Sequence, residues 1–320
     1  MTADRRWLSW PRLALAAPEG GRLAAHLAAE YGPPVPGAGD PCLKLLPERP
    51  SAPAWSAGGG HKGTRWELVV TAPERRPMEA WVRVRGPFGL PLIQSQVLEP
   101  LLAAAVADAD RALVPAAALR HDGLVELVVG DSGAGKTTLA MRALGAGWDV
   151  LGDDRVFVGS AGVEGFRRRH RVYPDARQTA PAFVERLTAG DRRELDLRTA
   201  VARLTRGFVR LPVLVDPPAQ KLGAVDVGRM TLLVRDTAPN GWLDDIDSLA
   251  ARLGAVIDRD RRALARLSGP WPEAFQHARA LELEALRRAA RGVPVRLVVS
   301  PTGPPAEAIA RVAAVFGLPE

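Results

Sequence analysis

The chain has 320 residues, of which 47% are hydrophobic and 25% charged, a composition that excludes a disordered protein. A single cysteine, Cys42, excludes an intramolecular disulfide and a cysteine-rich zinc site, and it suits a reducing compartment. The net charge of +7 permits an anionic partner, although 36 acidic residues among 43 basic ones are typical of a solvated surface.

No targeting or membrane-spanning segment is predicted. Pro11 and Arg12 interrupt the short apolar stretch at residues 7–17, which argues against a signal peptide. No run approaches 18 apolar residues. We therefore expect a soluble cytoplasmic protein without a membrane partner.

The first hundred residues differ in composition from the rest and hold five of the eight tryptophans. The Pro- and Gly-rich residues 32–60 predict a long loop or a partly disordered segment. Residues 65–71 and 79–85 predict two strands, and the proline-rich turn between them favours an antiparallel pair. Apolar residues at helical spacing over 93–113 predict a helix that leads into a second domain. We place an α+β domain at residues 1–110.

The most informative stretch is residues 130–137, here called the glycine loop, which fits the pattern G-x-x-x-x-G-K-[ST]. Residues 124–129 before it predict a buried strand, and residues 138–144 after it are good helix formers. Together they aim backbone N–H groups and a helix N-terminus at an anion. The candidate nucleotide-binding residues are Gly130, Asp131, Ser132, Gly133, Ala134, Gly135, Lys136, Thr137 and Thr138.

The lysine of this loop is itself informative, because the chain has only four lysines among its 43 basic residues. Lys136 stands at the loop position that requires a compact ammonium group, where it can reach the β- and γ-phosphates. The Thr137 hydroxyl can ligate Mg²⁺. The loop therefore indicates a site for ATP or another nucleoside triphosphate, with Mg²⁺.

A carboxylate pair, Asp153-Asp154, follows 17 residues beyond Lys136, on a strand predicted over residues 149–158. Ligands gather at the carboxyl ends of strands in a doubly wound sheet, so the pair is expected beside the phosphates. Phosphoryl transfer needs a metal ligand and often a group that accepts the nucleophile's proton, and two carboxylates can divide these roles. The structural alternative is that the pair only starts a turn.

Arginines follow the carboxylates. Arg155 is a candidate for stabilising transferred charge. A basic run follows at residues 167–171. Its members Arg167, Arg168 and Arg169 could bind substrate phosphates or an acidic peptide, since guanidinium groups pair with such oxyanions, or the run could form a solvated loop. The five dispersed histidines predict no zinc site.

The rest of the chain predicts an alternation of helices and strands without an internal repeat. We expect helices at residues 181–206, 244–291 and 305–316, and strands at 213–215, 230–234 and 293–300.

The chain resembles the HPr kinase/phosphorylase-like proteins in three places: residues 130–140, the turn Gly147-Trp148 and residues 151–154. The specific part of this resemblance covers about residues 97–160. The resemblance implies an α/β fold with a P-loop core related to phosphoenolpyruvate carboxykinase at residues 111–320, beside the smaller N-terminal domain. It implies that Lys136 and Thr137 bind phosphate and Mg²⁺, that Asp153 activates the acceptor hydroxyl, and that Asp154 binds metal. Family members assemble through their P-loop domains, which suggests a homo-oligomer.

One departure from the family pattern is Pro115, which stands where members commonly have a histidine; His121 lies six residues later and is not a substitute. The resemblance implies a kinase that phosphorylates a serine of a peptide or protein, or a small metabolite, as in peptide natural-product tailoring. Pro115 supports an alternative, a nucleotide-dependent regulatory or nucleic-acid-binding ATPase without kinase activity, although nucleic acid is the less expected partner. Small-metabolite kinases of the shikimate and gluconate type are a further alternative. Their usual Asp-x-Asp motif and N-terminal P-loop fit this chain less well.

Overall fold

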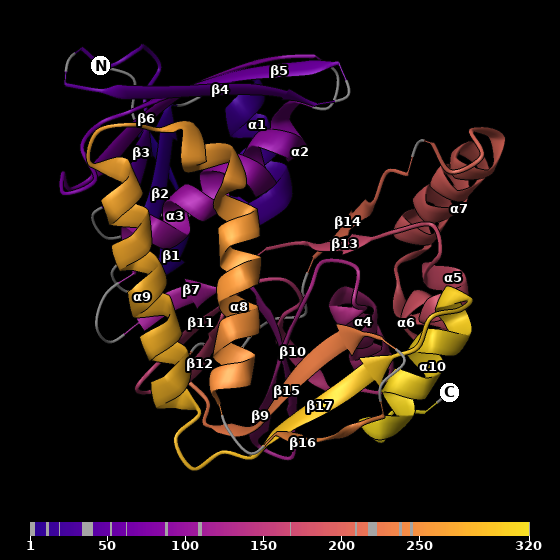
Figure 1. The fold of residues 1–320 in the computed structure, drawn as a ribbon. Helices are drawn as coiled ribbons and strands as arrows, with labels where there is room; N and C mark the ends of the chain where they lie inside the picture. The colour runs from indigo at the N-terminus through magenta and orange to yellow at the C-terminus, as the bar shows by residue number, and fades with distance from the viewer. Residues whose placement is uncertain are drawn as a thin grey trace. The chain divides into compact units, whose positions relative to one another are not determined.

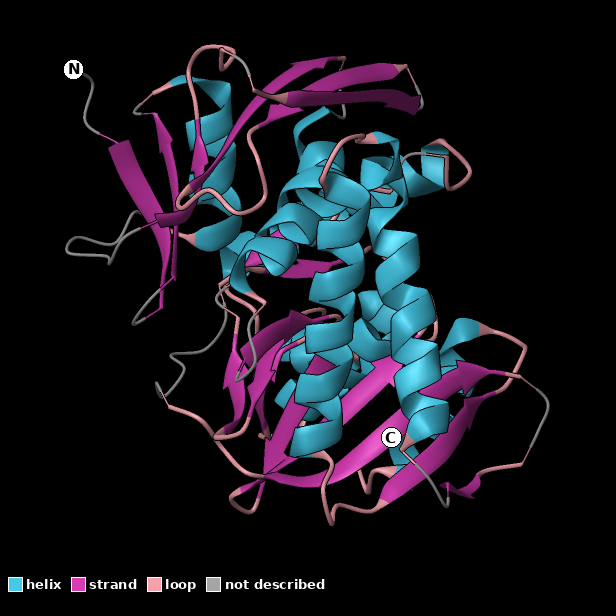
Figure 2. Ribbon diagram, turned by 60° about the vertical axis from the view of Figure 1, so that its left-hand side comes forward, coloured by secondary structure: helices cyan, strands magenta, loops and turns pink. Residues whose placement is uncertain are grey.

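The computed structural model describes residues 4–319 except 11–12, 19, 34–40, 52, 62, 87–88, 108–110, 167, 209, 217–222, 237–238 and 244–245. The chain divides into two compact units, each built of strands and helices (Figure 2). The first unit comprises Met1–Leu113 and Ile257–Ala285, and the second Val114–Val256 and Leu286–Glu320. The predicted mixed α/β class is confirmed.

The first unit is built around a six-stranded sheet in the order β1-β2-β3-β6-β5-β4. Strands β5 and β6 pair antiparallel, as predicted. The elements of its N-terminal segment are β1 (Asp4–Trp10), β2 (Leu13–Pro18), α1 (Gly21–Tyr31), β3 (Pro41–Leu45), β4 (Trp55–His61), β5 (Thr64–Val70), β6 (Met78–Arg85), α2 (Gly89–Ile93), the π-helical turn η1 (Gln94–Leu98) and α3 (Glu99–Val106).

One prediction for this segment is wrong, and a second is confirmed only in part. The predicted loop at residues 32–60 contains β3 and β4, because β3 pairs with β2 and β6 and β4 pairs with β5 along its whole length. The predicted helix at 93–113 begins earlier, at Gly89, and ends at Val106. Arg111–Val114 forms strand β7 instead, and its apolar residues are buried in an extended conformation.

The helical run Gly89–Val106 is the one stretch of the described residues that is long and apolar enough to cross a membrane. However, 67% of it is buried inside the protein. Such burial is that of a core helix, and it is compatible with the predicted soluble protein.

The first unit also takes in Ile257–Ala285, which the sequence analysis assigns to the second domain. This segment contains the end of α8 (Asp247–Asp260), the 3₁₀ helix η2 (Arg261–Arg266) and most of α9 (Trp271–Ala289). Arg266 Nη1 donates a hydrogen bond to the carbonyl of Gly58 in β4 (2.7 Å), and Arg261 and Glu282 form a buried ion pair (2.5 Å). Such long-range contacts leave no trace in local composition.

The second unit contains a six-stranded sheet in the order β10-β8-β9-β15-β17-β16. The predicted strands at 124–129, 213–215, 230–234 and 293–300 correspond to β9, β14, β15 and β17. The strands of the second unit, in this and smaller sheets, are β8 (Ala116–His121), β9 (Leu124–Gly130), β10 (Asp149–Gly152), β11 (Val156–Gly159), β12 (Gly162–Gly165), β13 (His170–Val172), β14 (Val213–Val215), β15 (Val227–Arg235), β16 (Gly241–Leu243) and β17 (Val295–Ser300). Its helices, besides the start of α8, are α4 (Lys136–Gly145), α5 (Ala176–Thr179), α6 (Pro181–Arg186), α7 (Ala189–Leu204) and α10 (Pro305–Val315).

Strand direction in this sheet decides where side chains can meet. Strands β9, β15 and β17 are parallel, and Figure 1 shows β15 and β17 side by side in one direction. Strand β8 is antiparallel to β9, and β10 is antiparallel to β8, so β10 runs in the same direction as β9. The carboxyl ends of β9, β10, β15 and β17 therefore lie at one edge of the sheet.

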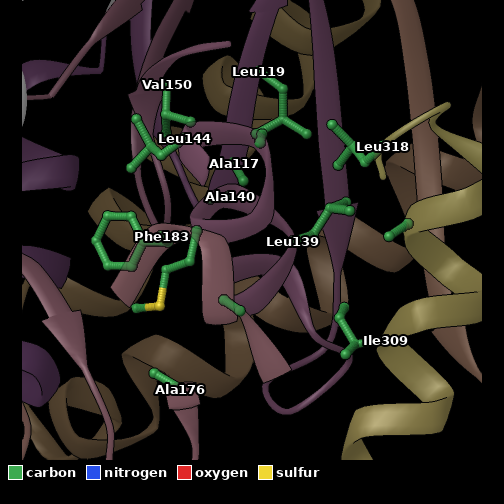
Figure 3. Packing of buried hydrophobic residues seen from close by; sticks show 14 of the residues in the cluster. Ala117, Leu119, Leu139, Ala140, Leu144, Val150, Ala176, Phe183, Ile309 and Leu318 are labelled. Carbon is green, nitrogen blue, oxygen red and sulfur yellow. The ribbon is translucent and has the colours of Figure 1, made fainter. Parts of the chain in front are cut away.

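A continuous apolar cluster holds helices α4 and α10 against this sheet. It includes Leu139 and Ala140 of α4, Ile309 of α10 and Ala117 and Leu119 of β8, which are labelled in Figure 3. Each of these side chains is at most 4% exposed. Burial of this kind stabilises by about 25 cal/mol per Å² of apolar surface.

A polar cluster lies on the same face of the sheet as the apolar cluster. It is nearer the amino ends of strands β9, β15 and β17, away from the edge where their carboxyl ends lie. Arg296 of β17 donates to Glu126 of β9 through Nε (2.9 Å) and Nη2 (2.6 Å), and Thr231 of β15 also donates to Glu126. Arg296 further donates to the carbonyl of Val315 (2.9 Å) and lies over the Phe316 ring. The guanidinium group therefore joins β9, β15, β17 and the end of α10.

Removal of Arg296 is expected to destabilise the second unit. In Arg296→Leu, Glu126 keeps its burial but loses its principal cation, at a cost of about 3 kcal/mol. Arg229 is the matched control, since it faces the same carboxylate at 3.8 Å but is 45% exposed, so Arg229→Leu should cost less than about 1 kcal/mol. Hydrogen exchange of the β15 and β17 amides measures both, and equal effects would contradict this role of Arg296.

Candidate functional site

The glycine loop and the carboxylate pair meet at the edge where β9, β10, β15 and β17 end. The loop follows β9 and Asp153-Asp154 follows β10. Both line one cavity of about 460 Å³ in the second unit. The lining residues are Ser132, Gly133, Ala134, Gly135, Lys136, Thr137, Thr138, Asp153, Asp154, Arg168, Arg169, Arg171, Tyr173, Asp175, Thr179, Arg210, Arg235, Ser300, Pro305, Ala308 and Ile309.

The glycine loop joins β9 directly to α4. A Cβ atom on Gly130 would lie 2.2 Å from the carbonyl oxygen of Leu233, so β9 can reach the edge beside β15 only with glycine at this position. Lys136 begins α4 and is buried, and its Nζ donates to the carbonyls of Gly130 (2.7 Å) and Asp131 (3.1 Å). The ammonium group therefore lies inside the loop, at the helix N-terminus, where the backbone dipoles favour an anion.

The predicted strand at residues 149–158 is interrupted by the carboxylates. It is divided into β10 and β11, and Asp153-Asp154 forms the bend between them, so the prediction of one continuous strand is wrong. The bend brings Gly152 close to the carbonyl oxygen of Arg155, where a Cβ atom would lie only 2.4 Å from that oxygen. Glycine permits the bend because it has no Cβ atom. The bend turns both carboxylates out of the sheet and into the cavity wall.

The two carboxylates have different surroundings. Asp153 is buried, and its Oδ1 lies 3.3 Å from Nδ1 of His170. Asp154 keeps half of its side-chain surface exposed, and its carboxylate accepts a hydrogen bond from Nη1 of Arg168 (2.8 Å). The two neighbours can therefore play different chemical parts.

The pKa of Asp154 is lowered from its ordinary value of 3.8. Desolvation is the largest single influence and raises the pKa, but the cations of Arg168, Arg155, Lys136 and Arg171 together outweigh it. Asp154 is therefore a carboxylate at neutral pH, and its favourable interactions weaken only as the pH falls through the lowered pKa.

The cavity is predominantly cationic. Six arginine and lysine side chains and three aspartates are among its described lining residues. Arg210 pairs with Asp175 (2.8 Å) and Arg169 with Asp216 (2.6 Å), while Arg168 pairs with Asp154. Such a surface favours a ligand that carries several negative charges.

The structure brings most of the predicted site residues to this cavity. Residues 132–138, Asp153, Asp154, Arg168 and Arg169 line it. Gly130 and Asp131 are not among the lining residues; Gly130 ends β9, and Asp131 pairs with Arg252.

The remaining predicted arginines differ in their placement. Arg155 is buried and close enough to Asp154 to lower the pKa of that carboxyl, but it is not among the lining residues. Arg167 lies outside the described residues.

Several lining residues were not predicted. Arg235 and Ser300 stand at the carboxyl ends of β15 and β17, and the rule that ligands gather there could have identified both. Arg171 belongs to the basic run that was noted in the sequence. Tyr173 and Arg210 come together through the pairing of β13 with β14, for which the sequence holds no signal.

Pro115 and His121 lie at opposite ends of β8. Pro115 is buried and precedes Ala116, which pairs with Val129 beside the glycine loop. His121 pairs with Leu124 at the far end of the same two strands and stacks on Trp148. His121 therefore cannot act at this cavity.

The oxygen ligands available in the cavity fit Mg²⁺ better than other common metals. Among the described residues, no group of three or more His, Cys, Asp or Glu side chains could hold a metal. Thr137 and Asp154 line the same cavity and offer one hydroxyl and one carboxylate oxygen. Mg²⁺ is usually bound by one or two such groups together with substrate phosphates and water.

No protein-family model matches the chain, and the curated proteins contain no match to it. The geometry of the cavity and the motif resemblance therefore carry the functional proposal.

We expect Arg168→Met to raise the pKa of Asp154, because this change removes the strongest of its cationic neighbours and leaves the burial cost in place. The carboxylate would then take up its proton at a higher pH than in the wild type. A ¹³C NMR titration of the Asp154 carboxyl measures the shift. Arg169→Met is the control, since Arg169 pairs with Asp216, and an equal shift there would contradict the assignment.

Proposed function

We propose that the chain is an ATP- and Mg²⁺-dependent kinase with an HPr kinase-like P-loop core, which transfers the γ-phosphoryl group to a hydroxyl. The observation that carries this proposal is the convergence of the glycine loop, Asp153 and Asp154 on one cationic cavity. The acceptor class is a serine of a peptide or protein, or a small metabolite. The cytoplasm, where ATP is available, is the proposed location.

Lys136 and the loop amides form the proposed phosphate site. The ammonium group lies inside the loop, close to the N-terminus of α4, so charge and helix dipole act on the same anion. Arg235 and Ser300 line the cavity from the ends of the two neighbouring parallel strands. A nucleoside triphosphate would be held by these groups through its phosphates.

Thr137 and Asp154 are the proposed protein ligands of Mg²⁺. The lowered pKa of Asp154 keeps its carboxylate charged, as a metal ligand must be. Bound Mg²⁺ would neutralise the charge that develops on the phosphates. Arg155, which is buried and does not line the cavity, would contribute by keeping the Asp154 carboxylate charged and not by direct contact with the phosphates.

Asp153 is the proposed general base. It would accept the proton of the acceptor hydroxyl as the hydroxyl oxygen bonds to the γ-phosphorus and the bond from that phosphorus to the bridging oxygen of ADP breaks. Arg168, Arg169 and Arg171 line the same cavity and would bind the acceptor's own acidic groups or the transferred phosphoryl oxygens.

Asp153→Asn is expected to reduce phosphoryl transfer by about 10²- to 10⁴-fold, because the amide cannot accept the proton, while ATP still binds. Transfer of label from γ-labelled ATP to serine peptides and hydroxyl metabolites measures phosphoryl transfer, and calorimetry measures ATP binding. Wild-type protein that hydrolyses ATP without labelling any acceptor would refute the kinase.

Lys136→Met is expected to weaken ATP binding at least about tenfold, because it removes a charge-assisted contact to phosphate. Lys44→Met is the control, since Lys44 lies on β3 in the first unit. Calorimetric titration with ATP and with inorganic tripolyphosphate measures both variants. Equal affinity of the two variants would contradict the phosphate site.

A nucleotide-dependent regulatory or nucleic-acid-binding ATPase is the second candidate. Pro115 favours it, because proline stands buried at the same sheet edge as the glycine loop and offers no titratable group there. This candidate is supported if DNA or RNA binds with a steep salt dependence while no acceptor is labelled.

A further inference from the structure

His170 is a buried imidazole that the proposed reaction does not use. It begins β13, where it pairs with Val215 of β14, and it is 2% exposed. Its Nδ1 lies 3.3 Å from Oδ1 of Asp153, slightly longer than most N–H···O hydrogen bonds. Its Nε2 is buried without a hydrogen-bond partner among the described residues.

His170 does not line the cavity proposed to hold substrate, so it has no direct contact with substrate there. Asp153 lines the cavity that also contains the glycine loop, and His170 is not among the residues lining that cavity. His170 instead lines a second cavity of about 610 Å³, with Arg169 lining both. The imidazole therefore contacts Asp153 from outside the first cavity.

A carboxylate that acts as a base must present one oxygen to the incoming hydroxyl at a fixed angle. A hydrogen bond to the other oxygen, from a group whose own rotation is blocked, sets that angle. The His170 ring meets this requirement, because it is buried and carried by a paired strand. Among the described residues Nε2 has no partner, and the carboxylate of Asp153 is the acceptor that lies near Nδ1.

We propose that His170 is a positioning residue that donates from Nδ1 to Oδ1 of Asp153 and so directs Oδ2 toward the acceptor hydroxyl. The inference rests on the proposed role of Asp153 as the base. The proton of the acceptor hydroxyl goes to Asp153, and His170 keeps its own. The competing explanation is a histidine that only fills space in the core.

A matched pair of amide variants tests this role. In His170→Asn the amide nitrogen lies where Nδ1 was, whereas in His170→Gln it lies closer to the place of Nε2. We expect His170→Asn to keep kcat within about threefold and His170→Gln to lose about 10- to 100-fold. The KM for ATP should be unchanged in both.

Thermal stability separates positioning from packing. Equal losses of kcat in the two variants, or losses that follow their melting temperatures, would overturn the inference. Full kcat in His170→Gln would overturn it as well. If the wild-type protein labels no acceptor, the kinase proposal fails instead.

A second measurement needs no activity. Nitrogen-15 NMR of the protein without nucleotide or metal reports which ring nitrogen carries the proton, and the spectrum of His170→Asn identifies the signal among those of the five histidines. We expect the proton on Nδ1 in the wild type and its transfer to Nε2 in Asp153→Ala. A wild-type ring protonated only on Nε2 would overturn the inference whatever the activity assays give.

Discussion

The common register of β9, β15 and β17 is the constraint on which the site depends. On one face of these strands, Glu126, Thr231 and Arg296 form the polar cluster toward the amino ends. The next residues on the same face, two positions further along each strand, belong to the apolar cluster and are Val128, Leu233 and Val298. Two residues further along each strand come Gly130, Arg235 and Ser300. A slip of one residue in the pairing of one of these strands would turn its side chains to the opposite face and separate the loop from the other cavity residues.

The sequence predicted the parts of this arrangement whose signals are local. The strands at 124–129, 230–234 and 293–300 are short apolar runs, because parallel strands are covered on both faces. The glycine loop was recognisable because its pattern combines particular residues at particular spacing. Asp153 and Asp154 could be placed beside it once the order of strand, helix and strand was clear. The pair was expected on a continuous strand, with a turn as the alternative. The bend depends on the close approach of Gly152 to the Arg155 carbonyl, which the sequence does not reveal.

The parts that could not be predicted depend on contacts between distant segments. Residues 257–285 belong to the first unit because Arg266 reaches Gly58, some two hundred positions earlier in the chain. His170 was noted only as a member of a basic run, which is usually solvated, yet its neighbour Arg168 pairs with Asp154 and the imidazole is buried beside Asp153. Burial of a polar side chain in such a run depends on the pairing of β13 with β14, for which composition carries no signal.

The antiparallel strand β8 sets the distance between the two strands that lead to the cavity. It lies between β9 and β10, so the chain enters the cavity from two strands that are two hydrogen-bonded spacings apart, or about 9.5 Å. That interval is a property of the backbone, and exchange of side chains leaves it unchanged. The surrounding segments can therefore vary in sequence while the span between the glycine loop and the carboxylate pair stays constant.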